Sequence, residues 1–269
     1  MTIAKMRSLS FLPICLFLLL VVTLVTTYTI AVLRGDVEVF FPYISETGGK
    51  PPESCIFGQF VNVACVLLLA TLYVRFKEVD TIEGLPSKQI NGLNKVSAVL
   101  GVAATLGMSV VANFQDTNVF VVHRIGAYTL FVCMTLYSML HTMITYLVCP
   151  EYSKPLVGIV RLLLSLSMFF TMVTCFTTSS IASAEWMNHH NPNDTEFFWK
   201  PTDGGYDFHI ASTMCEWALA VSFALFCLTF VSEFRHISLG VNMFLHTEPF
   251  SAVRLGNDIQ PNERTRLFV

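Results

Sequence analysis

The last apolar stretch of the chain carries polar side chains whose spacing could support acid–base or ligand chemistry. Four of them follow the i, i+3, i+4, i+7 spacing that places side chains on one face of a helix, namely His209, Ser212, Thr213 and Glu216. Glu216 lies about 8 residues beyond the start of this stretch, or roughly 12 Å at 1.5 Å per residue. Because an ionisable group inside an apolar helix is costly, Glu216 indicates either a functional site or a polar contact between helices.

Polar residues at the ends of neighbouring apolar stretches are predicted to lie at the same height as Glu216. One stretch ends with Asn113, Gln115 and Asp116, the next begins with His123 and Arg124, and the one after that ends near Glu185 and Trp186. We predict a polar cluster of five residues at one end of a helical bundle: Asn113, His123, Arg124, His209 and Glu216. In this cluster, Glu216 is either ionised and paired with Arg124 or shares a proton with one of the two histidines. The alternative is that these groups only join helices, through hydrogen bonds worth about 0.6 kcal/mol each.

Two further features of the apolar stretches indicate packing and not chemistry. His141 lies 18 residues beyond His123 on the same predicted helix, so it is roughly 27 Å away. It cannot join the cluster and is interpreted as an interfacial or hydrogen-bonded packing histidine. The preceding predicted helix has a smooth face that favours close contact with a neighbour, formed by Ser97, Gly101, Ala104 and Gly107.

Motifs that would indicate catalysis are absent from the sequence. There is no Walker loop, no nucleophile elbow, no HExxH motif and no paired cysteine motif. The histidines and carboxylates between residues 189 and 203 lack a recognised metal-ligand spacing. We therefore predict no catalytic residue, no metal and no cofactor, and favour a protein that is not an enzyme. A channel or transporter is a third interpretation, but no pair of broken helices marks a substrate site.

The elements that would position this cluster are membrane-spanning helices. Apolar residues make up 54% of the 269 residues. Charged residues make up 13%, whereas they make up roughly a quarter of soluble proteins. Six apolar stretches approach or exceed the length of about 20 residues that crosses a bilayer: residues 9–33, 56–76, 96–114, 119–148, 156–184 and 208–231. We predict an all-α integral membrane protein, with a single six-transmembrane-helix bundle in residues 1–235 and a C-terminal tail in residues 236–269. Nothing in the composition indicates binding to nucleic acid.

The distribution of Lys and Arg predicts the orientation of the bundle, because these residues collect on the cytoplasmic side of membrane helices. Twelve of them lie on the side of the termini, and four lie on the other side, namely Arg34, Lys50, Arg124 and Lys200. Both termini and the tail are therefore predicted to be cytoplasmic. The one N-glycosylation sequon begins at Asn193, in a loop on the lumenal side. Cys149 directly follows the fourth apolar stretch and is a candidate for palmitoylation.

The loop between the first two predicted helices is polar and rich in glycine and proline, so it interrupts the helices on either side. Its residues 42–58, PYISETGGKPPESCIFG, resemble the first lumenal loop of the damage-regulated autophagy modulator (DRAM) family, within the wider Frag/DRAM/Sfk group of six-helix proteins. Similar motifs follow in the same order: MSVVANFQ at 108–115, VVH at 121–123, FVC at 131–133, CP at 149–150 and YDFHIASTMCEWALA at 206–220.

The resemblance implies a lysosomal or endosomal multi-pass protein that promotes autophagy and, in stressed cells, cell death. Our leading interpretation is a non-enzymatic regulator or adaptor whose cytoplasmic surfaces act on autophagy or lysosomal membrane proteins. The alternative is a lipid-handling protein, for lipid-anchor remodelling or phosphoinositide and lipid organisation, whose lumenal cluster engages the head groups of membrane lipids. A plasma-membrane location would favour this alternative. We also predict that the loop from Tyr43 to Cys55 folds as a cap over the cluster around Glu216.

Overall fold

The protein is all-α in the computed structural model, which describes residues 8–82, 87–189 and 199–238. No β-strand occurs in these ranges. The helices are α1 (Phe11–Arg34), the 3₁₀ turn η1 (Glu46–Gly48), α2 (Glu53–Asp80), α3 (Ser87–Asn113), α4 (Phe120–Leu147), α5 (Pro155–His189), α6 (Tyr206–Leu228) and α7 (Val231–Phe234).

Six of these helices are long and apolar enough to cross a membrane. The predicted fold class, a six-helix membrane bundle, is therefore confirmed. The second, third and fifth helices are longer than the apolar stretches that predicted them, because a helix continues past the hydrocarbon into polar residues. The last span is nearly continuous from α6 into the short helix α7, with Thr229 and Phe230 between them.

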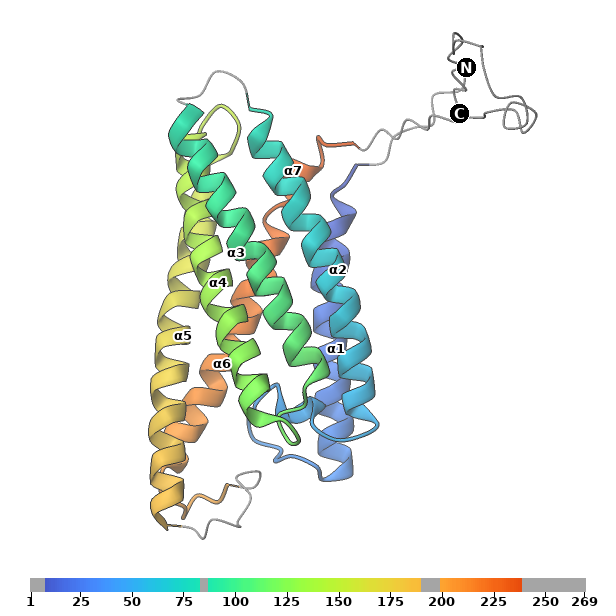
Figure 1. Ribbon diagram of the computed structural model, residues 1–269, viewed down its shortest axis with the longest axis vertical. Helices are drawn as coiled ribbons and strands as arrows, with labels where there is room; N and C mark the ends of the chain where they lie inside the picture. Colours follow the sequence, from blue (N-terminus) through green and yellow to red (C-terminus); the bar gives the residue numbers. More distant parts are fainter. Residues whose placement is uncertain (1–7, 83–86, 190–198, 239–269) are drawn as a thin grey trace, which may run out of the picture.

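Among the six long helices, those that are consecutive in the chain run side by side in opposite directions (Figure 1). The helices α3 and α4 approach each other closely, because a Cβ on Gly107 would lie 2.7 Å from the carbonyl oxygen of Gly126. A Cβ on Gly101 would similarly lie 2.8 Å from Leu72 of α2. The predicted smooth face of the third helix is therefore a packing surface. The pairs α3 with α4 and α5 with α6 pack extensively, whereas α4 and α5 pack together less.

The first and last described residues lie at the same end of the bundle (Figure 1). Ser8 forms an isolated β-bridge with Ser238, and the Leu9 N–H donates to the Ile237 carbonyl at 3.0 Å. We call this the terminal end. The opposite end carries three connections, residues 35–52, 114–119 and 199–205, and we call it the cap end.

Candidate functional site

Residues 35–52, which we call the cap, form an ordered structure between α1 and α2. Gly35 ends α1 in the left-handed conformation, with φ of 71°, and the following N–H of Asp36 returns to the Ala31 carbonyl at 2.9 Å. The Asp36 carboxylate pairs with Lys50 at 3.1 Å, which joins the two ends of the cap. These ion pairs with Lys50 and Arg34 lower the pKa of Asp36. The cap is thus closed on itself before it contacts other helices.

The cap is attached directly to α6. The backbone N–H of Ile44 donates to Glu216 Oε2 at 2.7 Å, and the indole N–H of Trp217 donates to the Pro42 carbonyl at 2.9 Å. Between them, the Tyr43 hydroxyl hydrogen-bonds with the Ser212 hydroxyl. Three consecutive cap residues therefore contact one face of α6, and the predicted cap over the region around Glu216 is confirmed.

The other side of the cap contacts α1, α2 and the connection between α3 and α4. The Thr47 hydroxyl lies 3.2 Å from that of Thr27 in α1, and both side chains are fully buried. The Thr117 hydroxyl donates to the Gly49 carbonyl at 2.9 Å. A Cβ on Gly48 would lie 2.6 Å from Cγ of Phe57 in α2, so this position has no room for a side chain. The close docking of the cap on α2 therefore requires glycine at position 48.

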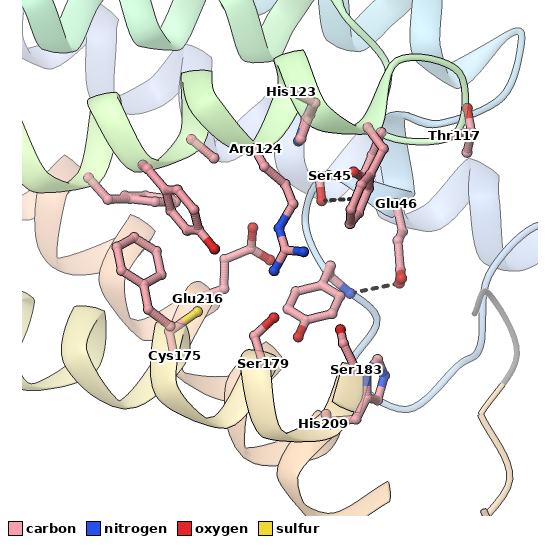
Figure 2. A pocket seen from close by; sticks show the side chains of 18 of the residues that line it. Ser45, Glu46, Thr117, His123, Arg124, Cys175, Ser179, Ser183, His209 and Glu216 are labelled. Carbon is pink, nitrogen blue, oxygen red and sulfur yellow. Dashed lines mark hydrogen bonds between the residues drawn. The ribbon is translucent and has the colours of Figure 1, made fainter. Parts of the chain in front are cut away.

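A cavity of about 450 Å³ lies beneath the cap, enclosed by α4, α5 and α6 (Figure 2). This volume is within the range of roughly 300–1,000 Å³ that is usual for small-molecule sites. Its ionisable lining residues are Glu46, Asp116, His123, Arg124, His209 and Glu216. Its aromatic lining residues are Tyr43, Phe120, Tyr128, Phe131, Phe176 and Trp199. The cavity therefore has both polar and aromatic walls.

Three carboxyl groups from different parts of the chain face this cavity: Glu46 from the cap, Asp116 from the α3–α4 connection and Glu216 from α6. Glu46 Oε2 accepts from the Tyr43 N–H at 3.0 Å, and Asp116 Oδ2 accepts from the Ser45 hydroxyl at 3.5 Å. Burial raises the pKa of Glu46 well above its usual range, and the neighbouring carboxylates raise it further. Burial also raises the pKa of Asp116, against the opposing effect of His123 and Arg124.

The basic and imidazole groups of the cavity are held by separate contacts. His123 Nδ1 lies 2.7 Å from the Phe114 carbonyl, which can only accept, so Nδ1 carries a proton and donates. Nε2 of a neutral His123 is then an acceptor. The Arg124 guanidinium stacks 4.8 Å from the Phe120 ring centroid, and Figure 2 shows it reaching into the cavity toward Glu216. The His209 ring stacks on Trp199 with centroids 4.4 Å apart.

Four of the five residues in the predicted polar cluster line this cavity: His123, Arg124, His209 and Glu216. Asn113 does not line it. The Asn113 side chain instead donates to Asn62 at 3.1 Å and to the Ser109 carbonyl at 2.7 Å, on the side of α3 that faces α2. Within the described part of the chain, no ion pair within 4.0 Å joins Arg124 and Glu216, and Glu216 accepts from the Ile44 N–H instead.

The predicted cluster of five residues contained neither Glu46 nor Asp116, although Asp116 was expected at a similar height in the bundle. Both lie outside the apolar stretches, in loops where a carboxylate is ordinarily solvated, so their residue types carried no signal. The position of Glu46 in the sequence could have identified it, because this residue lies inside the distinctive loop between the first two helices. Docking of that loop brings Glu46 to the cavity, and the connection between α3 and α4, which contacts the cap, brings Asp116.

A second polar network lies at the terminal end and joins α2, α4, α5 and α7. Arg161 of α5 is fully buried and pairs with Glu233 of α7 at 2.9 Å. Arg75 of α2, only 2% exposed, pairs with Glu78 at 2.8 Å and donates to His141 Nδ1 of α4 at 3.4 Å. His141 is therefore a buried, hydrogen-bonded packing histidine, as interpreted from the sequence. The burial of both arginines was not predicted, since they were counted as ordinary charges flanking the membrane.

The two predicted modification sites occupy different parts of the chain. Cys149 is half-buried and lies two residues beyond the end of α4. Asn193 lies outside the described residues. Palmitoylation of the first and glycosylation of the second remain predictions.

Comparison with known proteins gives a consistent result over most of the chain. Residues 8–237 match the Frag1/DRAM/Sfk1/Cwh43P N-terminal domain. The chain is 36% identical over 266 residues to human DNA damage-regulated autophagy modulator protein 2, which covers 97% of both chains. It is 35% identical over 240 residues to human DNA damage-regulated autophagy modulator protein 1, which covers 88% of this chain and 95% of the relative. No solved structure matches.

A more distant relative extends the same pattern. The Xenopus laevis protein named modulator of macroautophagy TMEM150B-B is 29% identical over 228 residues, which cover 84% of this chain and 86% of the relative.

Proposed function

The chain belongs to the Frag1/DRAM/Sfk1 family, and on this premise we propose that it is a lysosomal or endosomal multi-pass membrane protein that modulates autophagy as a non-enzymatic regulator. The observation that carries this proposal is the 97% coverage of a relative named as an autophagy modulator. The regulator acts through partner proteins at its cytoplasmic surfaces, and its activity in stressed cells extends to cell death.

The proposed orientation places the terminal end in the cytoplasm and the cap end in the lumen. The count of twelve Lys and Arg residues against four supports it. Two of the twelve, Arg75 and Arg161, are buried against glutamates and do not act as free flanking charges. Removing these two leaves ten against four, so the bias persists.

The test of this function is a rescue experiment in cells that lack the protein. The tagged chain is expected to restore autophagic flux, measured as the lysosome-dependent turnover of a lipidated autophagosome marker, and to overlap with a lysosomal marker in images. Replacement of the connection between α2 and α3 at residues 81–86 together with the tail at 236–269 is expected to abolish rescue without changing location. Full rescue by this replacement would overturn the regulator acting through cytoplasmic surfaces.

A second candidate function is lipid handling, and the cap-end cavity is the observation that favours it. Two of the residues that line the cavity, Phe120 of α4 and Met187 of α5, are also 45% and 67% exposed on the outside of the bundle. The cavity therefore opens at the surface of the bundle near the cap end. Cavity variants that retain their location and lose flux would support this function, whereas unchanged flux would remove it.

A further inference from the structure

The cap-end cavity continues into a second, apolar cavity of about 180 Å³ among α1, α2, α3, α4 and α6. The two share lining residues, which include His123, Phe131 and Glu216. The remaining walls of the second cavity are mostly aliphatic and aromatic, for example Leu20, Phe57 and Phe223. Polar groups thus lie at a junction between two spaces with hydrophobic walls, which is the arrangement that an amphiphilic ligand requires.

The polar part of the cavity holds more acceptors than donors. Three carboxyl groups face it, against the single guanidinium of Arg124. Asp116 Oδ1 is buried and makes no hydrogen bond. A buried acceptor without a partner is costly, so the ligand that fits this site is a donor, and a positively charged one fits best.

The packing of α4 against α5 indicates where such a ligand enters. Polar contacts join the two helices near the terminal end, where the Arg161 guanidinium donates to Thr145 at 2.7 Å and Thr142 lies 2.9 Å from Ser165. Toward the cap end the contact is an aromatic pair, Tyr128 with Phe176 at 4.5 Å, and both rings line the cavity. Hydrogen bonds therefore hold the two helices together near the terminal end, whereas toward the cap end two aromatic side chains form both the contact and the wall of the cavity.

We propose that the cap-end cavity binds a membrane amphiphile through a protonated amine, with the ammonium group against Glu46, Asp116 and Glu216 and the hydrocarbon chain leaving between α4 and α5. This inference deepens the second candidate function and rests on it. An ammonium group donates three hydrogen bonds and replaces the missing donor at Asp116 Oδ1. The surrounding aromatic rings add attraction for a cation.

Arg124 distinguishes two sources of such an amine. A sphingoid base has an ammonium group and hydroxyls but no phosphate, so it contacts only the carboxyl groups. Phosphatidylethanolamine has a phosphate as well, and the Arg124 guanidinium is the group that would pair with it. The amine is the shared chemistry, and only the phosphate-bearing lipid depends on Arg124.

The test uses the purified full chain in nanodiscs and a sphingosine probe with a diazirine in its chain and a terminal alkyne. A long-chain alcohol of equal length with the same two groups is the neutral control probe. Sphingosine is expected to label the cap-end halves of α4 and α5, located by mass spectrometry, several times more strongly than the alcohol. Equal labelling by the two probes would overturn the proposal.

Competition identifies the source of the amine. If excess unlabelled sphingosine reduces labelling and phosphatidylethanolamine does not, the ligand is a phosphate-free base. If phosphatidylethanolamine also reduces labelling, and no longer does so in Arg124→Gln, the ligand is the phosphate-bearing lipid. Loss with a water-soluble polyamine but with neither lipid would overturn the amphiphile, and loss with none of the three would overturn the site.

Matched variants test the carboxyl groups. Asp116→Asn and Glu46→Gln are expected to reduce sphingosine labelling by about tenfold, the effect of losing one charge-assisted hydrogen bond. Ala127→Phe fills the junction of the two cavities and is expected to reduce labelling without a change of charge. Asp207→Asn, on the exposed side of α6, is the control and keeps full labelling. Unchanged labelling in the three cavity variants would overturn the proposal even if one of them were unstable.

The same variants separate the site from the function. Variants that lose labelling and keep autophagic flux leave the binding site in place and remove the lipid-handling function. Variants that keep labelling and lose flux support a role for the cavity in the function and overturn the assignment of its ligand.

Discussion

Glu216 and Ile44 are 172 residues apart in the chain, and the carboxylate of the first accepts a 2.7 Å hydrogen bond from the backbone N–H of the second. This bond attaches the cap to the last long helix, directly beside the cavity. The same carboxyl group therefore has a structural role in holding the cap and a position from which it can contact a ligand. Variants can separate the two roles.

The first prediction concerns the hold of Glu216 on the cap. Glu216→Gln keeps an acceptor for the Ile44 N–H, whereas Glu216→Ala leaves that N–H without a partner at a cost of about 1–3 kcal/mol. Hydrogen–deuterium exchange of residues 42–48 is expected to accelerate strongly in the Ala variant and only slightly in the Gln variant. Asp207→Asn is the control on the same helix. Equal acceleration in the Gln and Ala variants would show that the charge, and not the hydrogen bond, holds the cap.

The second prediction concerns the docking of the cap on α2. Gly48→Ala places a Cβ 2.6 Å from the Phe57 ring, so it is expected to destabilise the protein by about 1–3 kcal/mol through overpacking. The measurement is the unfolding temperature of the protein in detergent. Gly92→Ala is the control, because its Cβ meets no atom within 4 Å and alanine favours the helix. Phe57→Leu is expected to restore part of the loss in the double variant.

The third prediction concerns the network at the terminal end. Removal of Arg161 leaves Glu233 buried without its 2.9 Å partner, so Arg161→Met is expected to cost about 3–5 kcal/mol. The double variant Arg161→Met with Glu233→Met is expected to be more stable than either single variant, because it removes both charges. Lys77→Ala is the control, since it breaks an exposed pair with Asp80 worth about 0–1 kcal/mol. A double variant that loses the sum of the two single losses would contradict this account.

The fourth prediction concerns pH. The pKa of Glu46 and that of Asp116 are raised in the folded protein above their ordinary values of 4.5 and 3.8. Between the ordinary and the raised value, the folded protein binds more protons than the unfolded chain. The stability contribution of these two groups is therefore complete below about pH 4 and is lost as pH rises through their folded pKa values.

This pH dependence can be measured as a change in unfolding temperature, and Asp36 serves as a control within the same protein. Unfolding temperatures between about pH 4 and 8 are expected to fall less steeply toward high pH in Glu46→Gln, which cannot ionise, than in the original chain. Asp36 is expected to show the opposite pH dependence of stability. Ion pairing lowers its pKa, so its contribution to stability is lost as pH falls below about 4. An identical pH profile for Glu46→Gln and the original chain would contradict the prediction. Cation binding in the cavity is expected to strengthen as pH rises, since it requires ionised carboxylates.

The fifth prediction concerns orientation. If the cap end is lumenal, Asn193 is accessible to glycosylation, and enzymatic deglycosylation is expected to increase the mobility of the protein in a gel. Asn193→Gln is expected to have the mobility of the deglycosylated protein from the start. A sequon engineered between residues 80 and 90 is the control and is expected to remain unmodified. Modification of that engineered sequon would reverse the proposed orientation.

Hydropathy by itself determined the architecture, because the length of an apolar stretch is a local property, and this length has to match the thickness of the hydrocarbon core of the bilayer. The same holds for Glu216, because a carboxylate within an apolar helix is conspicuous in the sequence alone. The docked cap was predicted on the basis of the loop sequence and its expected side of the membrane. The partners of the cap were not predictable, since Thr27, Phe57 and Thr117 come from three separate segments.

Only the tertiary structure decided which polar groups meet. Asn113 lies at the expected height, but its direction around α3 turns it toward Asn62 and away from the cavity. Glu46 reaches the cavity because the cap docks on α6, and it meets Asp116 there because the cap also contacts the connection between α3 and α4. Arg75 and Arg161 have the sequence positions of exposed flanking charges and the burial of core residues. Depth in the membrane follows from counting residues along a helix, whereas the facing partner of a side chain follows from how the helices and loops pack.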